Sequence, residues 1–215
     1  DFDDVENKLL ISKKIQYFNP VLTVSSVKKL NEMDFFEHRY LAVADKELLK
    51  FAEPYPNVEI LKRNAEAVKQ GVNPQHVTFA HYCEVPSDYI FVFNPCLPFV
   101  TVDTIKRAFD YFQENDHPSY TSVIKTGDWV FDSEGEPVTN TNPKNLTTNK
   151  DLQFYKAAHA FHIVNKKFFA TKGYHWEFIA NDPHMVEIPE EQCVDVDTEI
   201  EFDLAEALYM RRNCK

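Results

Sequence analysis

The feature that most constrains this chain is an alternation of short apolar runs with amphipathic helical runs along most of its 215 residues. The clearest strand candidates are short and rich in β-branched or aromatic side chains, at residues 40–44, 89–93, 120–124 and 158–164. Such an alternation is typical of a sheet covered by helices on both faces. We therefore predict an α/β fold with a mostly parallel, doubly wound sheet.

Three helices are indicated by local signals. From Thr101 onward, apolar residues recur at helical spacing, at Ile105, Ala108, Phe109 and Phe112. The segment Thr198-Glu199-Ile200-Glu201 has the spacing of a capping box and predicts a helix over about 199–212. Asn73 before Pro74 predicts a third helix that runs to about residue 83, with Asn73 as its N-cap.

The amino-acid composition argues against nucleic acids and membranes as partners. Lysine and arginine together number 23 against 34 aspartates and glutamates, so the formal net charge is −11. Because so acidic a surface repels a nucleic-acid backbone, we expect no nucleic-acid partner. No run approaches the roughly 18 apolar residues of a membrane span, and the four cysteines show no CxxC spacing. We expect a cytoplasmic protein that does not contact a membrane.

The segment with the clearest chemical signal is Cys193-Val194-Asp195-Val196-Asp197-Thr198. In an extended backbone Asp195 and Asp197 project to the same side, because side chains alternate between faces. Two carboxylates at the end of a strand can bind Mg²⁺ together with substrate phosphates. Alternatively, both aspartates serve only the positive N-terminal end of the following helix.

Two further positions have competing interpretations. Asn94 follows the apolar run 89–93 and precedes Pro95, so its side chain either faces a ligand at a strand end or forms a local turn. His159 and His162 are three residues apart. In a regular strand this spacing sends the two imidazoles to opposite faces, so we expect that they do not share a metal.

Several of these segments resemble motifs of one enzyme family. Residues 195–199, Asp-Val-Asp-Thr-Glu, are similar to the Asp-Ile-Asp-Thr-Glu motif of the acylneuraminate (CMP-sialic acid synthetase-like) cytidylyltransferases. Residues 94–101, Asn-Pro-Cys-Leu-Pro-Phe-Val-Thr, resemble that family's Gln-Pro-Thr-Ser-Pro-Leu-Arg-Thr segment. Residues 40–45 look like its second strand, which ends in Ser-Thr-Asp, and residues 19–22 look like its Gly-Lys-Pro-Leu entry to the first helix.

The resemblance implies a nucleotidyltransferase that transfers CMP from CTP to a sialic acid-like acidic sugar and releases pyrophosphate. It implies that Asp195 and Asp197 hold Mg²⁺, with Asp197 also catalytic. Lys8 and Lys13 fall on the two lysines of the family's N-terminal phosphate loop, which gives them a catalytic role. By the same resemblance, the residues that bind nucleotide or acceptor are Lys62, Arg63, Asn94, Lys156 and His159.

Residues 127–156 interrupt the alternation. Trp129-Val130-Phe131 and the Gly135-containing turn after it predict a hairpin, which a polar stretch rich in Asn and Thr follows. We predict that residues 1–126 and 157–215 form the α/β domain and that 127–156 form an excursion from it. The resemblance implies that this excursion holds two copies together as a homodimer.

Two other functions stay open at this stage. Asp4-Val5-Glu6 stand where the family has Arg-Gly-Gly, which places acid where a triphosphate would bind. A catalytically impaired relative with a binding or regulatory role is therefore one alternative. A metal-dependent glycosyltransferase that uses a nucleotide sugar is the other, because an Asp-x-Asp pair also binds the metal in such enzymes.

Overall fold

The computed structural model describes residues 21–64, 67, 73–139 and 154–213. The strands are β1 Tyr40–Val43, β2 Glu59–Lys62, β3 Tyr89–Phe93, β4 Tyr120–Thr126, β5 Phe154–Asn165 and β6 His184–Glu187. The helices are α2 Gln75–Thr78, α3 Val102–Glu114, α4 Lys166–Lys172 and α5 Glu199–Asn213, with short 3₁₀ turns η1 Lys46–Phe51, η3 Ala80–Glu84 and η5 Glu190–Gln192. Residues 21–32 are also helical.

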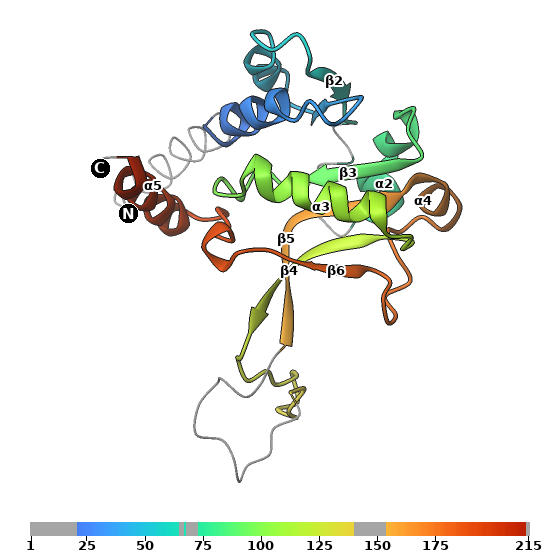
Figure 1. Cartoon of the computed structure of the whole chain (residues 1–215), viewed down its shortest axis with the longest axis vertical. Helices are drawn as coiled ribbons and strands as arrows, with labels where there is room; N and C mark the ends of the chain where they lie inside the picture. Colours follow the sequence, from blue (N-terminus) through green and yellow to red (C-terminus); the bar gives the residue numbers. More distant parts are fainter. Residues whose placement is uncertain (1–20, 65–66, 68–72, 140–153, 214–215) are drawn as a thin grey trace, which may run out of the picture.

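The described strands form two sheets. β1 and β2 pair in parallel, and a four-stranded sheet has the order β3-β5-β4-β6 (Figure 1). In the larger sheet β4 and β6 are parallel, whereas β5 is antiparallel to both of its neighbours. The predicted α/β class is confirmed, with β5 as the strand that runs against the parallel direction.

Helices cover both faces of the larger sheet. On one face, Ile105 and Ala108 of α3 pack against Phe161 of β5, which has no exposed surface. On the other face, Tyr82 of η3 and Phe169 of α4 pack against the sheet in a second cluster. Alternate residues of β3 contribute to the two clusters, because successive side chains of a strand point to opposite faces. The two-sided covering is that of a doubly wound sheet.

The strand predictions agree with the structure at β1 and β3, which are short apolar runs. β3 occupies the predicted residues 89–93, and β1 lies within 40–44. β4 and β5 are longer than predicted, since they continue as a paired ribbon through Lys125 and Thr126 against Tyr155 and Phe154. These outer positions carry polar or isolated aromatic side chains, so no apolar run marked them as strand.

The helix predictions differ in outcome. α3 begins after Thr101, whose hydroxyl accepts the backbone N–H of Thr104 at 3.1 Å. The capping box before α5 is confirmed, because Glu201 Oε2 accepts the N–H of Thr198 at 2.7 Å. The helix predicted over 73–83 is wrong in detail. Its N-cap is Pro74, not Asn73, and after one short α-helical segment the backbone changes at Phe79 into the 3₁₀ turn η3.

A bulge in β5 reorients two histidines. Thr121 pairs with His162 and Val123 with Ala157, so four residues of β5 lie opposite Ser122 alone. The Ser122 hydroxyl accepts the N–H groups of Ala160 (2.9 Å) and Phe161 (3.1 Å), and His159 takes a φ of +53°. The rings of His159 and His162 lie 5.7 Å apart. The prediction that they face opposite sides is wrong, because the bulge breaks the regular alternation.

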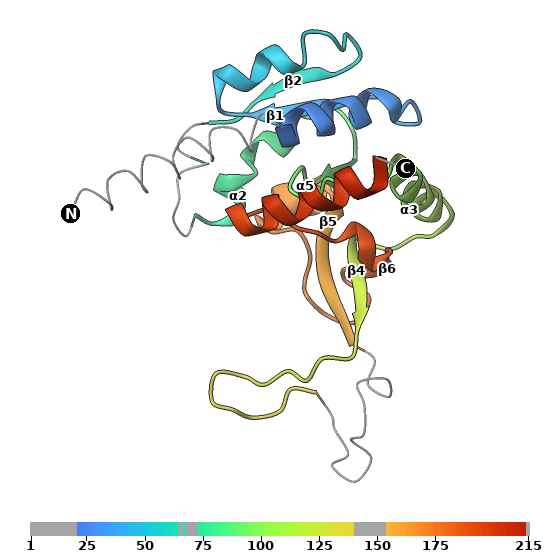
Figure 2. The ribbon, with the colours of Figure 1, turned by 90° about the vertical axis from the view of Figure 1, so that its left-hand side faces the viewer.

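The predicted hairpin is present in the excursion. Phe131 and Pro137 form an antiparallel bridge, and Gly135 takes a φ of +87° at the turn, a conformation that glycine adopts without strain. Figure 2 shows this segment, in yellow, projecting from the end of β4 and β5 away from the helices. Residues 140–153, the polar stretch, lie outside the described residues, and the division into domains stays a prediction.

No helix within the described ranges combines the length and the apolar composition that crossing a bilayer requires.

Two buried histidines, His81 and His175, and the half-buried His162 lie on the sheet face opposite α3. Burial lowers the pKa of His81, His162 and His175 to about 4 each. The folded protein therefore holds these imidazoles neutral at a pH where the unfolded chain, with a histidine pKa of about 6.5, already binds protons. Protonation of the unfolded chain therefore lowers the free energy of unfolding. The protein has its full stability above pH 6.5 and loses part of it as the pH falls toward 4.

We predict that the free energy of unfolding decreases between pH 6.5 and 4.5, by about 1.4 kcal/mol per pH unit for each buried histidine. Replacing one of them, as in His81→Gln, reduces this slope. Urea denaturation at a series of pH values measures it. His38→Gln is the control, because His38 lies at the surface beside Glu59. Equal slopes for wild type and His81→Gln would contradict the prediction.

Candidate functional site

The two predicted metal ligands meet a third side chain. Cys96 Sγ and one carboxylate oxygen each from Asp195 and Asp197 all lie within 4.8 Å of one another. Cys96 comes from the loop that follows β3, and the aspartates come from the segment between η5 and α5. Two segments far apart in the sequence thus converge beside the end of β3, the place where open α/β sheets bind ligands.

Backbone contacts hold these segments together. Val196 N–H donates to Cys96 O at 2.9 Å, and the Val196 side chain is buried with Phe99 and Ala205. With Val196 held inward, its neighbours Asp195, half-buried, and Asp197, exposed, both direct an oxygen toward Cys96, although the segment is not a strand. Glu201 Oε2 accepts the N–H of Asp197 at 3.0 Å, which joins the segment to the start of α5.

The helix-terminus interpretation of the aspartates stays open, because an interaction with the positive end of α5 needs no hydrogen bond. The hydrogen bonds at the start of α5 are made by Thr198 and Glu201, in the reciprocal arrangement of a capping box. Asp195 Oδ1 is buried and has no hydrogen-bond partner. A buried carboxylate oxygen without a partner is costly, and a bound cation is one of the few groups that can compensate it.

The electrostatics of the three groups indicate an unbalanced negative site. Burial, followed by the negative charge of Asp197, raises the pKa of Asp195. Burial and the two carboxylates raise the pKa of the Cys96 thiol to about 11. Each effect disfavours negative charge on these atoms when no cation lies between them. The donor set therefore fits a divalent cation, which Asp195 and Asp197 would hold.

Asn94 takes part in the turn that positions Cys96. Its Oδ1 accepts the N–H of Cys96 at 3.0 Å, and its own N–H donates to Ala160 O at 2.9 Å. The turn interpretation of Asn94 is confirmed. Its predicted role in ligand binding stays a prediction.

The two predicted acceptor-binding residues, Lys156 and His159, lie on β5, the neighbour of β3 in the larger sheet. His159, next to Ala160, is exposed and close enough to Asp195 that its positive charge would favour the ionised carboxylate. Lys156 is exposed and acts in the same way on Cys193, two residues before Asp195. The structure thus brings Asn94, His159 and the aspartates together, with Lys156 on the same side.

The remaining predicted residues lie elsewhere. Arg63 follows β2 and donates from Nη2 to Thr78 O at 3.2 Å, and its charge acts on His81 and Tyr82. Lys62 is an exposed residue at the end of β2. Contacts of the described residues place Arg63 with the buried histidines and not with the aspartates. Lys8 and Lys13 lie outside the described residues.

Sequence reasoning missed two side chains around this loop. Cys96 carried one signal, its position between two prolines directly after a strand. Lys29, from the helix over 21–32, donates to Pro98 O and lies 5.7 Å from the ring centre of Phe93. Burial lowers the pKa of Lys29 to about 8. No local pattern distinguished Lys29 from other lysines of an amphipathic helix.

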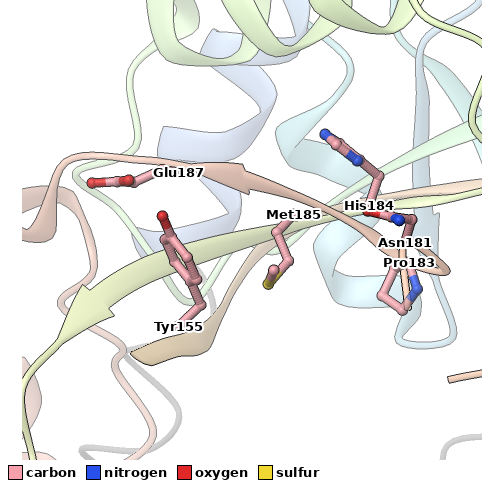
Figure 3. A pocket seen from close by; sticks show the side chains of 6 residues that line it. All are labelled: Tyr155, Asn181, Pro183, His184, Met185 and Glu187. Carbon is pink, nitrogen blue, oxygen red and sulfur yellow. The ribbon is translucent and has the colours of Figure 1, made fainter. Parts of the chain in front are cut away.

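A shallow hollow beside β6 lies apart from these residues. Figure 3 shows its lining side chains, which are Tyr155, Asn181, Pro183, His184, Met185 and Glu187. The imidazole Nε2 of His184 is 3.0 Å from the Tyr111 hydroxyl, and its ring stacks on His117. These contacts hold His184 in place, and no predicted site residue lines the hollow.

The chain is similar to known proteins in structure but not in sequence. No protein-family model matches the sequence, and no curated protein sequence matches it significantly. CMP:2-keto-3-deoxy-manno-octonic acid synthetase complexed with CTP superposes with a TM-score of 0.62 at 8% identity, over 89% of this chain and 88% of that chain. The chain shares its fold. A 4-diphosphocytidyl-2C-methyl-D-erythritol synthase from Anaerococcus prevotii superposes with a TM-score of 0.64 at 13% identity. The superposition covers 88% of this chain and 89% of that chain.

A third solved structure, the bifunctional IspDF from Campylobacter jejuni, gives a TM-score of 0.54 at 11% identity, over 85% of this chain and 45% of that chain. At these identities the likeness establishes the fold alone. It is an α/β fold, in agreement with the class that the sequence predicts. None of the three is an acylneuraminate enzyme by name.

We predict that Asp195→Asn stabilises the protein in the absence of metal. The substitution removes the repulsion with Asp197 and replaces a half-buried carboxylate, one oxygen of which has no hydrogen-bond partner, by a neutral amide. We expect an increase in the free energy of unfolding of roughly 0.5–2 kcal/mol, a usual gain when strain at a functional site is relieved. Urea denaturation with a chelator present measures it.

Asp203→Asn is the matched control, since Asp203 is exposed on α5. Its effect is expected within about 0.5 kcal/mol. A loss of stability in Asp195→Asn would show that the carboxylate serves the fold and not a cation.

Proposed function

We propose that the protein is a magnesium-dependent nucleotidyltransferase that transfers CMP from CTP to an acidic, sialic acid-like sugar. The observation that carries the proposal is the pair Asp195 and Asp197 beside the end of β3, with a buried Asp195 oxygen that lacks a partner. The fold that the chain shares with structures named as a CMP-sugar acid synthetase and a diphosphocytidyl-methylerythritol synthase supports the nucleotide class.

The reaction places specific demands on the site. An acceptor hydroxyl attacks the α-phosphorus of CTP, and the bond to the pyrophosphate leaving group breaks. When bound, Mg²⁺ supplies positive charge that offsets the charge developing on the phosphates. Asp195 and Asp197 hold the cation, and the contact of Val196 with Cys96 keeps the two carboxylates in register with the β3 loop.

Residues on β5 suit an acidic acceptor. Lys156 and His159 are exposed at the edge that carries the aspartates, so they can balance the carboxylate of a sugar acid. Lys8 and Lys13 remain the proposed cations for the triphosphate, and Lys62 or Arg63 the one for the nucleotide.

We expect the purified protein to release pyrophosphate from CTP in the presence of Mg²⁺ and a sialic acid-like sugar, and not from the other three nucleoside triphosphates. Asp197→Asn should reduce turnover by roughly 100-fold or more, because the cation loses a ligand. Asp203→Asn should retain it. A coupled pyrophosphate assay measures these rates.

Other outcomes of this experiment favour the alternatives. Metal-dependent binding of CTP without turnover would indicate the regulatory relative, in agreement with the acidic segment at residues 4–6. Preferential binding of a UDP-sugar would indicate the glycosyltransferase. Full turnover in Asp197→Asn would exclude the proposed role of the pair.

We further propose that two copies associate through the excursion. Its described part exposes Trp129, Phe131 and Val138, with 49%, 57% and 64% of their surfaces accessible. Val130 is exposed as well, and a hairpin with four large apolar side chains in solvent is unfavourable for a monomer, whereas an interface would bury them.

We predict that Phe131→Glu weakens the dimer at least about tenfold, because it places a charge in an apolar contact. Sedimentation velocity over micromolar concentrations measures the association. Ile179→Glu is the control, since Ile179 is 67% exposed on a loop outside the excursion. A monomeric wild-type protein would contradict the proposal.

A further inference from the structure

The carboxylate pair includes a sulfur atom as a close neighbour. Cys96 Sγ lies within 4.8 Å of an oxygen of Asp195 and of Asp197, and those oxygens lie within the same distance of each other. Among the residues that the structure describes, no other three Asp, Glu, His or Cys side chains come together in this way. The arrangement is therefore specific to this site.

The backbone fixes where the thiol lies. The N–H of Cys96 donates to Asn94 Oδ1, and its C=O accepts the N–H of Val196, the residue between the two aspartates. Both amide groups beside the Cys96 side chain are thus engaged. Because one of these bonds reaches the aspartate segment itself, the sulfur and the two carboxylates move as a unit.

A purely packing role for the thiol fits this environment poorly. Cys96 touches the apolar cluster of Leu22, Phe99, Val196 and Ala205, where a small apolar side chain would pack equally well. Instead, two carboxylates face the sulfur, and Asp195 Oδ1 is buried without a partner. A cation bound by all three groups would offset the negative charge of the two carboxylates, one of which carries the unpartnered oxygen.

The chemistry of the donor set indicates which cation. Mg²⁺ takes oxygen ligands almost exclusively, whereas Zn²⁺ and Co²⁺ bind thiolate and carboxylate together. We infer that Cys96 is a third ligand of this site, which therefore binds thiophilic divalent cations such as Zn²⁺, Co²⁺ and Cd²⁺ in addition to the Mg²⁺ of the proposed function. The inference rests on the proposed function for the presence of a cation between the carboxylates.

Coordination would need only small movements. Zinc–sulfur and zinc–oxygen bonds of about 2.3 and 2.0 Å require ligand atoms roughly 3.5 Å apart. Side-chain rotations that move these atoms by about 1 Å would bring them to that distance. On binding, the S–H bond of Cys96 is replaced by a sulfur–metal bond, and the proton leaves to solvent. No electrons are transferred.

The first test is the absorption spectrum of the protein with Co²⁺ alone. We expect a sulfur-to-cobalt charge-transfer band in wild-type protein, which disappears in Cys96→Ser. Cys193→Ser and Cys83→Ser are matched controls that should keep the band. Cys193 is half-buried two residues before Asp195, and Cys83 is exposed elsewhere. A band that survives in Cys96→Ser, or that wild-type protein lacks, would overturn the inference.

Calorimetry with metal alone gives an independent measurement. Cys96→Ser should weaken the binding of Cd²⁺, the softest probe, at least about tenfold and leave the affinity for Mg²⁺ unchanged. Equal losses for both ions would show that the substitution disturbs the carboxylates and that sulfur is not a ligand.

If Cys96→Ser does not fold, the inference can still be tested on the wild-type protein. The rate at which Cys96 is alkylated, followed by peptide mass spectrometry, should fall with Zn²⁺ or Cd²⁺ and not with Mg²⁺. Equal protection by Mg²⁺ would overturn the inference, because that ion would cover the thiol without bonding to it.

These readouts separate the inference from the proposed function. A cobalt–sulfur band in a protein that never turns over CTP would support the sulfur ligand and overturn the transferase proposal. Turnover of CTP with Mg²⁺ in a protein that shows no such band would support the transferase proposal and overturn the sulfur ligand.

Discussion

The structure depends on the pairing of β5 with both of its neighbours. The inner half of this strand joins β3 to β4 and buries Phe161 beneath α3, so it holds the core of the larger sheet together. Its outer half continues with β4 as a ribbon that leads to the hairpin. The bulge between the two halves turns His159 out of the strand pattern, toward the edge that carries Asp195. One strand thus links the core, the site and the proposed dimer contact.

The site itself is organised around an uncompensated negative charge. Two carboxylates and a thiol share one place, and a buried oxygen of Asp195 has no partner. Such an arrangement costs free energy in a protein without a bound cation, and it persists because the surrounding contacts enforce it. The bond from Val196 to Cys96 and the capping box before α5 are those contacts. The cost is of the kind expected where a protein is prepared for a ligand and not for maximal stability.

The buried histidines beside Arg63 form a second polar region, distinct in character. His81, His162 and His175 are held neutral by burial, and aromatic rings pack around them. We interpret these histidines as structural, because the surrounding rings of Tyr82 and Phe169 belong to the core on that sheet face. Arg63, which follows β2, donates to Thr78 O in this region.

Local signals in the sequence determined the α/β class, strand β3, the start of α3 at Thr101, the capping box before α5 and the pairing of Asp195 with Asp197. Each of these follows from residues within a few positions of one another, where propensity, periodicity and capping act. The contact of Cys96 with the aspartates, the reversed direction of β5 and the turning of His159 came only from the tertiary structure. They depend on strand order and on a bulge around Ser122, and no local pattern encodes which distant segments a sheet brings side by side.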